Sequence, residues 1–342
     1  MPVQGTQFFG GEGPFYNDVI STSARFSDDN NKYLQLTHSG TPTSTKIFTF
    51  SCWIKKWDLG EAPNIFGSDK GTSGGPGDAG WLAIDGDQKI NVANITSASY
   101  NLRFITTPVF RDLTQWYNMV FRFDTTQSDA ADRVRIYVNG TQQDGAYSTT
   151  PGLNADIAYN YANSKMRIAG LGYADGYEAN IYLADVNHID GTSYGPENFG
   201  ETKNGVWIPK DTSGLSFGNN GYRLQFKNTG TGTASSSTIG ADTSGNDYHF
   251  TSNNMAADDS ALPDCPENNF ATWNPLMVGG QMKNSMNGGE SNRTFAEGNL
   301  SASLVANTWA YASQICPSGK WYVEICVKTI GSTNGEISWG WH

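Results

Sequence analysis

Residues 116–140 read WYNMVFRFDTTQSDAADRVRIYVNG, and this stretch decides the fold. Apolar and polar side chains alternate through residues 117–123, and they alternate again through residues 134–138 after a polar linker. Period-two alternation predicts strands with one buried face. Asn139 and Gly140 form a strong turn signal, because both residues tolerate positive φ. The stretch therefore predicts two antiparallel strands and the start of a third at TQQDG.

The same stretch resembles the central strands of the concanavalin A-like, laminin-G-like jelly roll. Members of that family carry a Trp…Val…Asp segment that is followed by a Y-x-N-G hairpin. The matching places are held here by Trp116, Asp124, Tyr137, Asn139 and Gly140. The resemblance implies an all-β fold, an antiparallel jelly-roll sandwich of the concanavalin A-like type. It implies little about activity, because a fold does not determine a function.

The composition agrees with an all-β protein that has many turns. Of the 342 residues, 16% are charged, 13% are aromatic and 39 are glycine, and the length leaves room for two domains. The net charge of −11 argues against a nucleic-acid partner, which would need a basic face. No apolar run of about 18 residues occurs, so membrane insertion is not expected. No signal peptide is recognised at the start, which predicts synthesis in a cytoplasm without a cleaved export signal.

Further strands are predicted on both sides of the opening stretch. Residues 48–54 alternate cleanly in FTFSCWI, and this segment resembles the opening of laminin-G-like domains. Residues 179–186, ANIYLADV, read as a strand that is buried on both faces, and residues 222–226, YRLQF, read as the last strand of the sandwich. The predicted jelly roll therefore spans residues 21–228.

The remaining segments are predicted to lie outside that sandwich. Residues 1–20 read as an arm that docks on another protein through Phe8, Phe9, Phe15 and Tyr16, because exposed aromatic side chains are costly without a partner. A floppy terminus is the alternative. Residues 229–294 are rich in Gly, Ser and Asn and read as a connector. Residues 295–342 hold alternating strands such as KWYVEICVK.

The last two segments carry a second resemblance. The stretch IGADTSGNDYHFTSNN, followed by PDCPENNFATWNPL, resembles a connector in large structural proteins of tailed bacteriophages of aquatic bacteria. In those proteins a laminin-G-like domain is followed by a SPRY-type domain. Residues 295–342 resemble the start of such a domain, an incomplete second β-sandwich. We therefore expect either a longer gene product or strands that pair with another element.

The sequence does not predict an enzyme. Glucanases of this fold carry a Glu-x-Asp-x-(x)-Glu strand, which places the acid and the nucleophile on one face. The ANIYLADVNHID strand carries only Asp185 and Asp190, and no Gly-x-Ser-x-Gly nucleophile motif is present. Four cysteines occur without a CxxC pair, which argues against a zinc site. No cofactor is expected apart from calcium.

Sugar binding needs an aromatic platform with polar groups that fix hydroxyls. The candidate residues are Trp81 beside Asp78, and Tyr173 and Tyr177 around Asp175. The alternative is that Trp81 belongs to the core and that the tyrosines are ordinary surface residues. Calcium is bound by loop carboxylates and carbonyls, for which Asp85, Asp87 and Asp175 are the candidates.

Together these observations predict a bacteriophage virion structural protein, either a tail fibre or spike or a head-decoration component, that presents a glycan-binding jelly roll for host attachment. The expected partners are other virion proteins, host surface glycan and further copies of the same chain. Two alternatives stay open: a purely architectural virion protein without sugar binding, and a secreted lectin-like protein.

Overall fold

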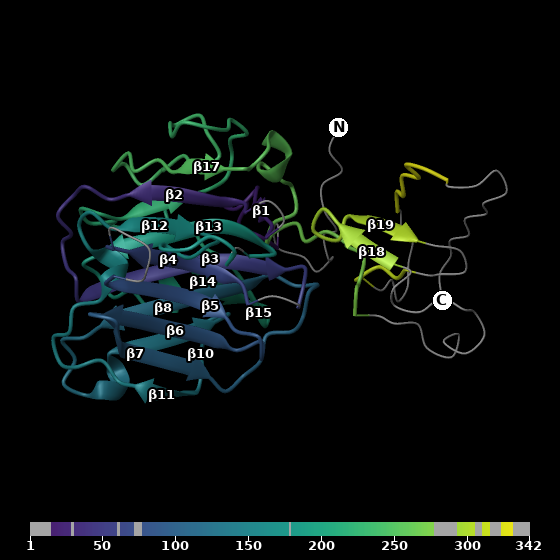
Figure 1. Cartoon of the computed structure of the whole chain (residues 1–342). Helices are drawn as coiled ribbons and strands as arrows, with labels where there is room; N and C mark the ends of the chain where they lie inside the picture. The colour runs from purple at the N-terminus through teal and green to yellow at the C-terminus, as the bar shows by residue number, and fades with distance from the viewer. Residues whose placement is uncertain are drawn as a thin grey trace.

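Two antiparallel β-sheets pack face to face with one hydrophobic core between them (Figure 1). The computed structural model describes residues 15–28, 31–59, 62–71, 77–177, 179–276, 293–304, 310–314 and 323–330. Within these residues the helical parts are single 3-10 turns, and none has the length and apolar character needed to cross a bilayer. The predicted fold class, an all-β concanavalin A-like sandwich, is confirmed.

The first sheet has seven strands and contains the stretch that opens the sequence argument. Its order is β1 (Ala24–Phe26), β13 (Ile181–Asp190), β3 (Ile47–Lys56), β8 (Tyr117–Asp124), β9 (Val134–Val138) and β10 (Thr141–Gln142), with β16 (Tyr222–Leu224) also paired to β13. The predicted pair and the start of a third strand are β8, β9 and β10. At the β9–β10 turn the φ angles are 48° at Asn139 and 77° at Gly140, as the Asn-Gly signal requires.

The second sheet has eight strands, which run from β11 at the bottom of Figure 1 to β17 at its top. Its order is β11 (Gly145–Thr149), β7 (Ser99–Thr106), β6 (Ile90–Thr96), β5 (Ala79–Ile84), β4 (Asn64–Asp69), β12 (Lys165–Ile168), β2 (Tyr33–Thr37) and β17 (Thr251–Asn253). Alternate side chains of both sheets fill the core, among them Phe50 of β3 and Phe121 of β8, which are fully buried. The period-two prediction is confirmed for these strands.

The two sheets differ in what covers their outer faces. Trp53, Trp116 and Tyr182 point outward from the seven-stranded sheet, and each is almost fully buried. Segments that are distant in sequence cover them, including Ile20, Cys265 and Trp207 of the hairpin formed by β14 (Gly200–Lys203) and β15 (Val206–Pro209). A neighbouring cluster around Val120 is covered by residues 194–217. The outward apolar side chains of this sheet are therefore core residues.

Residues 15–20 are the described part of the predicted N-terminal arm. Phe8 and Phe9 lie outside the described residues, but residues 15–20 pack on the protein itself. The rings of Phe15 and Tyr16 meet edge to face with centroids 4.9 Å apart. The Asn17 side-chain amide donates hydrogen bonds to Glu201 at 2.9 Å and to the carbonyl of Pro209 at 3.0 Å. These contacts seat Phe15 and Tyr16 beside the β14–β15 hairpin.

The prediction that the sandwich ends near residue 228 is wrong, and so is the predicted connector of residues 229–294 in its first part, residues 229–262. β17 adds to β2 as the edge strand of the eight-stranded sheet, and Ile239 and Phe250 are fully buried in the core. The Asp242 carboxylate organises this segment by accepting hydrogen bonds from the amides of Arg223, Ser244 and Tyr248. The polar composition suggested a linker, but a few apolar residues at buried positions anchor this segment to the sandwich.

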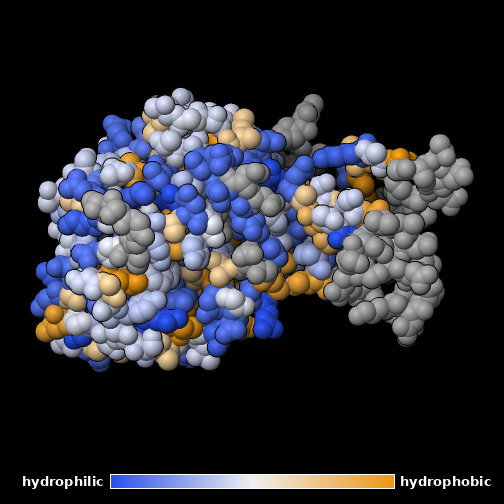
Figure 2. Space-filling view, viewed as in Figure 1, coloured by the Kyte–Doolittle hydropathy of each residue, from blue (hydrophilic) through white to orange (hydrophobic). Residues whose placement is uncertain are grey.

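The C-terminal part begins with a hairpin of β18 (Arg293–Ala296) and β19 (Ser301–Leu304), which lies beside the sandwich (Figure 1). Its turn contacts the seven-stranded sheet: the Tyr182 hydroxyl donates to the carbonyl of Gly298 at 3.0 Å, and the Asn299 amide donates to the carbonyl of Trp57 at 2.6 Å. Figure 2 shows a group of apolar residues in this region, on a surface that is otherwise mainly polar. The strand predicted in KWYVEICVK is not formed in its described part, because residues 323–330 are exposed and have no strand partner among the described residues.

Candidate functional site

The outer face of the eight-stranded sheet carries the aromatic residues that the sequence singled out. Cross-strand partners on this face form one row, which runs Gln35, Arg167, Gly67, Trp81, Ala93 and Arg103. Trp81 is flanked by glycine and alanine, so its indole is only half buried beside two small neighbours. Among the described residues, none of the buried hydrophobic clusters outside the core covers this face; they belong to the other sheet. Trp81 is therefore a surface aromatic residue on the open sheet.

Tyr100 extends the aromatic surface next to Trp81. The two rings meet edge to face with centroids 5.9 Å apart. The Arg103 guanidinium lies 5.3 Å from the centroid of the Tyr100 ring, and Arg103 forms no ion pair among the described residues. Tyr100 is 42% exposed, which leaves its ring accessible. Sequence reasoning missed both residues, because they belong to β7, a different strand from that of Trp81, and only strand pairing brings the two strands to one face.

Tyr173 and Tyr177 reach the same face through the loop that follows β12. This loop crosses the sheet closely because two glycines meet there: a Cβ on Gly67 would lie 2.6 Å from the carbonyl oxygen of Gly170, and a Cβ on Gly172 would lie 2.6 Å from the carbonyl carbon of Ser68. Any larger residue at Gly67 or Gly172 would push the loop away from the sheet. The glycines thus bring two tyrosines to a strand that lies far from them in sequence.

Polar contacts fix this loop in place. Arg167 donates to the carbonyl of Ala174 at 2.9 Å and to the carboxylate of Asp175 at 2.7 Å. The Asn64 side-chain amide donates to the carbonyl of Tyr177 at 3.0 Å. Burial raises the pKa of Tyr173, and the nearby Tyr177, Tyr100 and Asp69 raise it further. The loop therefore lies across β4, with Tyr173 close enough to Tyr177 and Tyr100 for the electrostatics of the three phenols to be linked. We call the four residues Trp81, Tyr100, Tyr173 and Tyr177 the aromatic patch.

Asp175 belongs to the support of the patch. Its carboxylate is 65% exposed, but one oxygen is held by Arg167, whose own side chain is almost buried. The Arg167 guanidinium also lies 4.0 Å from the centroid of the Tyr33 ring. Asp175 therefore positions the loop, and its second oxygen faces solvent.

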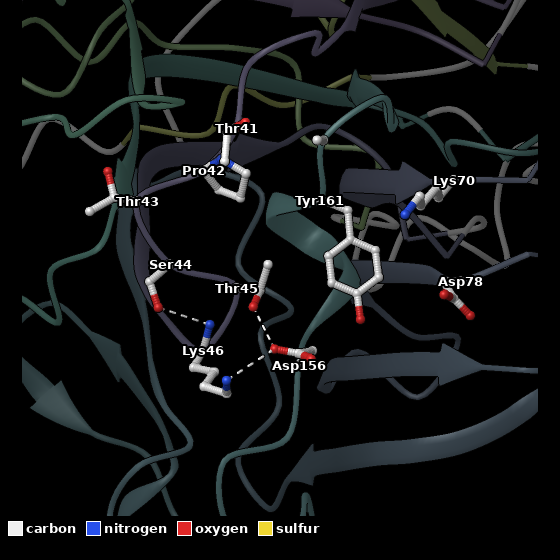
Figure 3. A pocket seen from close by; sticks show the side chains of 11 residues that line it. Thr41, Pro42, Thr43, Ser44, Thr45, Lys46, Lys70, Asp78, Asp156 and Tyr161 are labelled. Atoms are coloured by element: carbon white, nitrogen blue, oxygen red, sulfur yellow. Dashed lines mark hydrogen bonds and ion pairs between the residues drawn. The ribbon is translucent and has the colours of Figure 1, made fainter.

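Asp78 lies apart from the patch. It precedes β5 and lines a pocket of about 650 Å³ at one end of the sandwich. We call this cavity the end pocket (Figure 3). Its lining comes from three segments: Thr41, Pro42, Thr43, Ser44, Thr45 and Lys46; Lys70 and Asp78; and Asp156, Tyr161 and Ala162. The structure therefore separates Asp78 from Trp81, although the sequence placed them in one site.

The calcium candidates do not converge. The Asp85 carboxylate accepts hydrogen bonds from the amides of Asp87 and Lys89, both at 3.0 Å, which closes the turn between β5 and β6. Asp87 is exposed on that same turn, whereas Asp175 lies on the loop after β12. No group of three or more His, Cys, Asp or Glu side chains suited to a metal occurs within the described ranges. Calcium binding stays a prediction without a ligand set.

Comparison with known proteins agrees with this fold. Residues 28–186 match the family model of the concanavalin A-like lectin/glucanases superfamily. No curated protein sequence matches the chain. The laminin-G-like and jelly-roll resemblance is thus confirmed for the part of the chain that contains the aromatic patch and the end pocket.

Several solved structures are similar to this chain at low identity. A heptameric SAP-like pentraxin from Limulus polyphemus has 18% identity and a TM-score of 0.38 over 52% of this chain and 79% of its own. Domains LG4-5 of the mouse laminin α1 chain have 12% identity and a TM-score of 0.35 over 66% of this chain and 53% of their own. The CBM40 of a Ruminococcus gnavus sialidase, bound to α2,3-sialyllactose, has 10% identity and a TM-score of 0.33 over 48% of this chain and 88% of its own.

Proposed function

We propose that this protein binds glycans through the aromatic patch, as a structural component of a bacteriophage virion. The observation that carries the glycan part is the position of the patch. Four aromatic residues gather on the outer face of the eight-stranded sheet, whereas the outer face of the other sheet is buried under the chain's own segments. Accessible aromatic side chains that cluster on a soluble protein mark a binding surface.

The chemistry of the patch suits a sugar. The flat faces of Trp81 and Tyr100 can pack against the C–H face of a pyranose ring, and polar groups beside them can fix its hydroxyls. Arg103 supplies guanidinium donors and lies on the same face, next to Tyr100. The free oxygen of Asp175 supplies an acceptor at the edge of the loop. Ring stacking with a few directed hydrogen bonds is what a lectin-like site requires.

We further propose that the protein binds without catalysis. The two carboxylates of the ANIYLADVNHID strand are both engaged in structural contacts. Asp185 pairs with Arg223 at 2.9 Å, and Asp190 accepts hydrogen bonds from the amides of Thr43 and Asn220. Carboxylates held in this way support the fold and are not presented to a substrate.

The virion part of the proposal rests on sequence resemblance. Residues 239–276 resemble a connector of phage structural proteins, and residues 295–342 resemble the start of a SPRY-type domain. A tail fibre, a spike or a head-decoration protein would display the open sheet face toward the host. Other virion proteins and further copies of this chain would then be its partners, and its site of action would be the particle.

A glycan array followed by calorimetry tests the patch. We expect Trp81→Ala to weaken binding about fivefold, because one stacked aromatic contact is worth about 1 kcal/mol. The matched control is Val206→Ala, which removes an exposed apolar side chain of β15 on the opposite side of the molecule. Equal binding by Trp81→Ala and Val206→Ala would contradict the site, and absence of glycan binding by the wild type would leave the architectural alternative.

Immunogold labelling of intact particles tests the virion part. Label at a tail tip or on projecting fibres would support a fibre or spike. Label spread over the head would support a decoration protein. Particles without label would contradict the virion proposal and would favour the secreted, lectin-like alternative.

A further inference from the structure

The end pocket is a concave site that shares no lining residue with the aromatic patch. Residues from parts of the chain that are distant in sequence converge on it: residues 41–46, Lys70 with Asp78, and Asp156 with residues 161–162. Its volume of about 650 Å³ lies within the range of small-ligand sites. Figure 3 shows the side chains of Tyr161, Asp78, Asp156 and Lys46 around a common space.

Tyr161 presents a free hydroxyl in this pocket. The hydroxyl lies between Asp156 and Asp78 in Figure 3, and it makes no hydrogen bond with any described residue. Burial, then Asp156 and Asp78, raise the pKa of Tyr161 to about 12. The phenol is therefore protonated at neutral pH and can both donate and accept a hydrogen bond.

The charged groups of the pocket balance one another. Lys46 lies 3.6 Å from Asp156 as a partly exposed ion pair. The Lys70 ammonium lies 5.3 Å from the centroid of the Tyr161 ring and has no ion-pair partner among the described residues. Asp78 uses one carboxylate oxygen to accept the amide of Ser97 at 3.1 Å, which leaves its other oxygen available. Two ammonium groups and two carboxylates thus line one cavity.

This arrangement selects a neutral ligand that is rich in hydroxyls. A hydroxyl donates one hydrogen bond and accepts others, so a pair of neighbouring hydroxyls matches a carboxylate next to an ammonium. Because the two positive and two negative charges offset one another, neither a free anion nor a free cation gains a net attraction in this pocket. The Tyr161 ring adds an apolar surface for the C–H groups of a sugar.

We propose that the end pocket binds one neutral sugar residue, independently of the aromatic patch. Tyr161 holds its hydroxyls from one side, and Lys70 and Asp78, which are backbone neighbours, hold them from the other. The proposal goes beyond glycan binding at the patch, because it assigns a second site with its own ligand class. Two sites at different places on one sandwich would let one protein engage two branches of a host surface glycan.

Amide NMR shifts test the proposal on the full chain. The probes are the methyl glycosides of glucose, galactose and mannose, with N-acetylneuraminic acid as the anionic counterpart. We expect at least one neutral glycoside to shift amides of residues 43–46 and 161 and to do so equally in Trp81→Ala. We expect Tyr161→Phe, which removes only the hydroxyl, and Lys70→Met to weaken that binding at least about threefold.

Three results would overturn the proposal. The first is the absence of shifts in the pocket with every neutral glycoside. The second is a response to N-acetylneuraminic acid alone. The third is unchanged affinity in both Tyr161→Phe and Lys70→Met. Shifts in the pocket that persist in Trp81→Ala would support it even if the patch itself bound no glycan, so the two sites can fail separately.

Discussion

Lys55 shows how one buried charge attaches a distant segment to a sheet. Its side chain points outward from β3 and is fully buried. The ammonium donates to Asp264 at 2.9 Å, to Asn269 at 2.8 Å and to the carbonyl of Phe270 at 3.2 Å. Trp116 donates its indole N–H to the other oxygen of Asp264 at 3.1 Å. The pair therefore fixes residues 264–270 over the seven-stranded sheet.

Removing the negative partner should be costly. Asp264→Asn keeps the shape of the side chain but leaves the Lys55 ammonium buried without its counter-charge, which typically destabilises by about 3 kcal/mol. Urea unfolding would measure the change in the free energy of unfolding. Asp258→Asn, at an exposed position of the same part of the chain, is the control. If both variants lost equally little stability, Lys55 would not be holding this segment.

His38 and His188 make the fold sensitive to acid. Both imidazoles are fully buried, and burial lowers the pKa of His38 to about 4 and also lowers the pKa of His188. Nearby Asp190 opposes the shift at both residues. The unfolded chain binds a proton at each of these histidines more readily than the folded protein does. Their contribution to the free energy of unfolding is therefore fully present above about pH 6.5, the usual histidine pKa, and is lost as the pH falls toward 4.

We expect the free energy of unfolding to drop by about 3 kcal/mol from His38 alone between pH 7 and pH 4. Urea titrations at several pH values would measure the slope. His38→Phe should flatten it, because an apolar ring can keep the contact with Tyr248, whose ring centroid lies 4.1 Å away. If the free energy of unfolding of His38→Phe depended on pH as it does in the wild type, the acid sensitivity would come from other groups.

At the scale of elements, the segment of residues 229–262 is part of the sandwich. It contributes β17 and the buried side chains of Ile239, Phe250 and Met255. Phe250 meets Tyr222 of β16 edge to face, with ring centroids 4.8 Å apart. The last strand of the sandwich therefore comes after a polar stretch that has the composition of a linker.

Phe250→Ala should destabilise the whole domain by about 3–5 kcal/mol, the usual cost of removing a buried phenylalanine ring. Thermal unfolding followed by far-UV circular dichroism would show the loss as a lower midpoint of a single transition. Thr233→Ala, an exposed position of the same segment, should change the midpoint little. Equal midpoints for Phe250→Ala and the wild type would mean that the segment behaves as a linker after all.

The sequence predicted the strands better than it predicted what covers them. Alternation placed residues 48–54 and 117–123 correctly in the core, because side-chain direction in a strand depends only on local geometry. It could not show that outward-facing Trp53 is covered by Ile20 and Cys265, because those contacts join segments more than 30 residues away from it. Alternation within one strand says nothing about which distant segment packs on its outer face.

The same contrast between local sequence pattern and long-range contact applies to the candidate site. Residue type was enough to select Trp81, Tyr173 and Tyr177, and the structure brings them to one face. The convergence depends on the close approach of Gly67 and Gly172, which no local pattern encodes. Asp78 was grouped with Trp81 because it is near in sequence, but it precedes β5 and lines the end pocket instead.

At the scale of the whole molecule, the two sheets are unequal. β13 is buried along its full length, and β3 is buried at every position but its first. Both lie between the core and the segments that cover the seven-stranded sheet. The eight-stranded sheet has the core on one side and the aromatic patch on the other. The molecule therefore has a covered side and an open side, and the open side is where a ligand can reach a sheet face.

Hydrogen exchange should reproduce this order. Amides of β3 and β13 should exchange slowest, through global unfolding, because both of their faces are packed. Amides of the β18–β19 hairpin should exchange first, because its side chains are at most half buried.

A glycan that occupies the aromatic patch should slow amide exchange in residues 170–177, which cross the open face. It should leave exchange in β13 unchanged, because β13 opens only when the whole domain unfolds. Mass spectrometry of peptides from the free and the glycan-bound protein would measure both. Two outcomes would contradict the division into a covered and an open side. One is slower exchange on glycan binding in β13 alone, and the other is a β18–β19 hairpin whose amides exchange as slowly as those of β3.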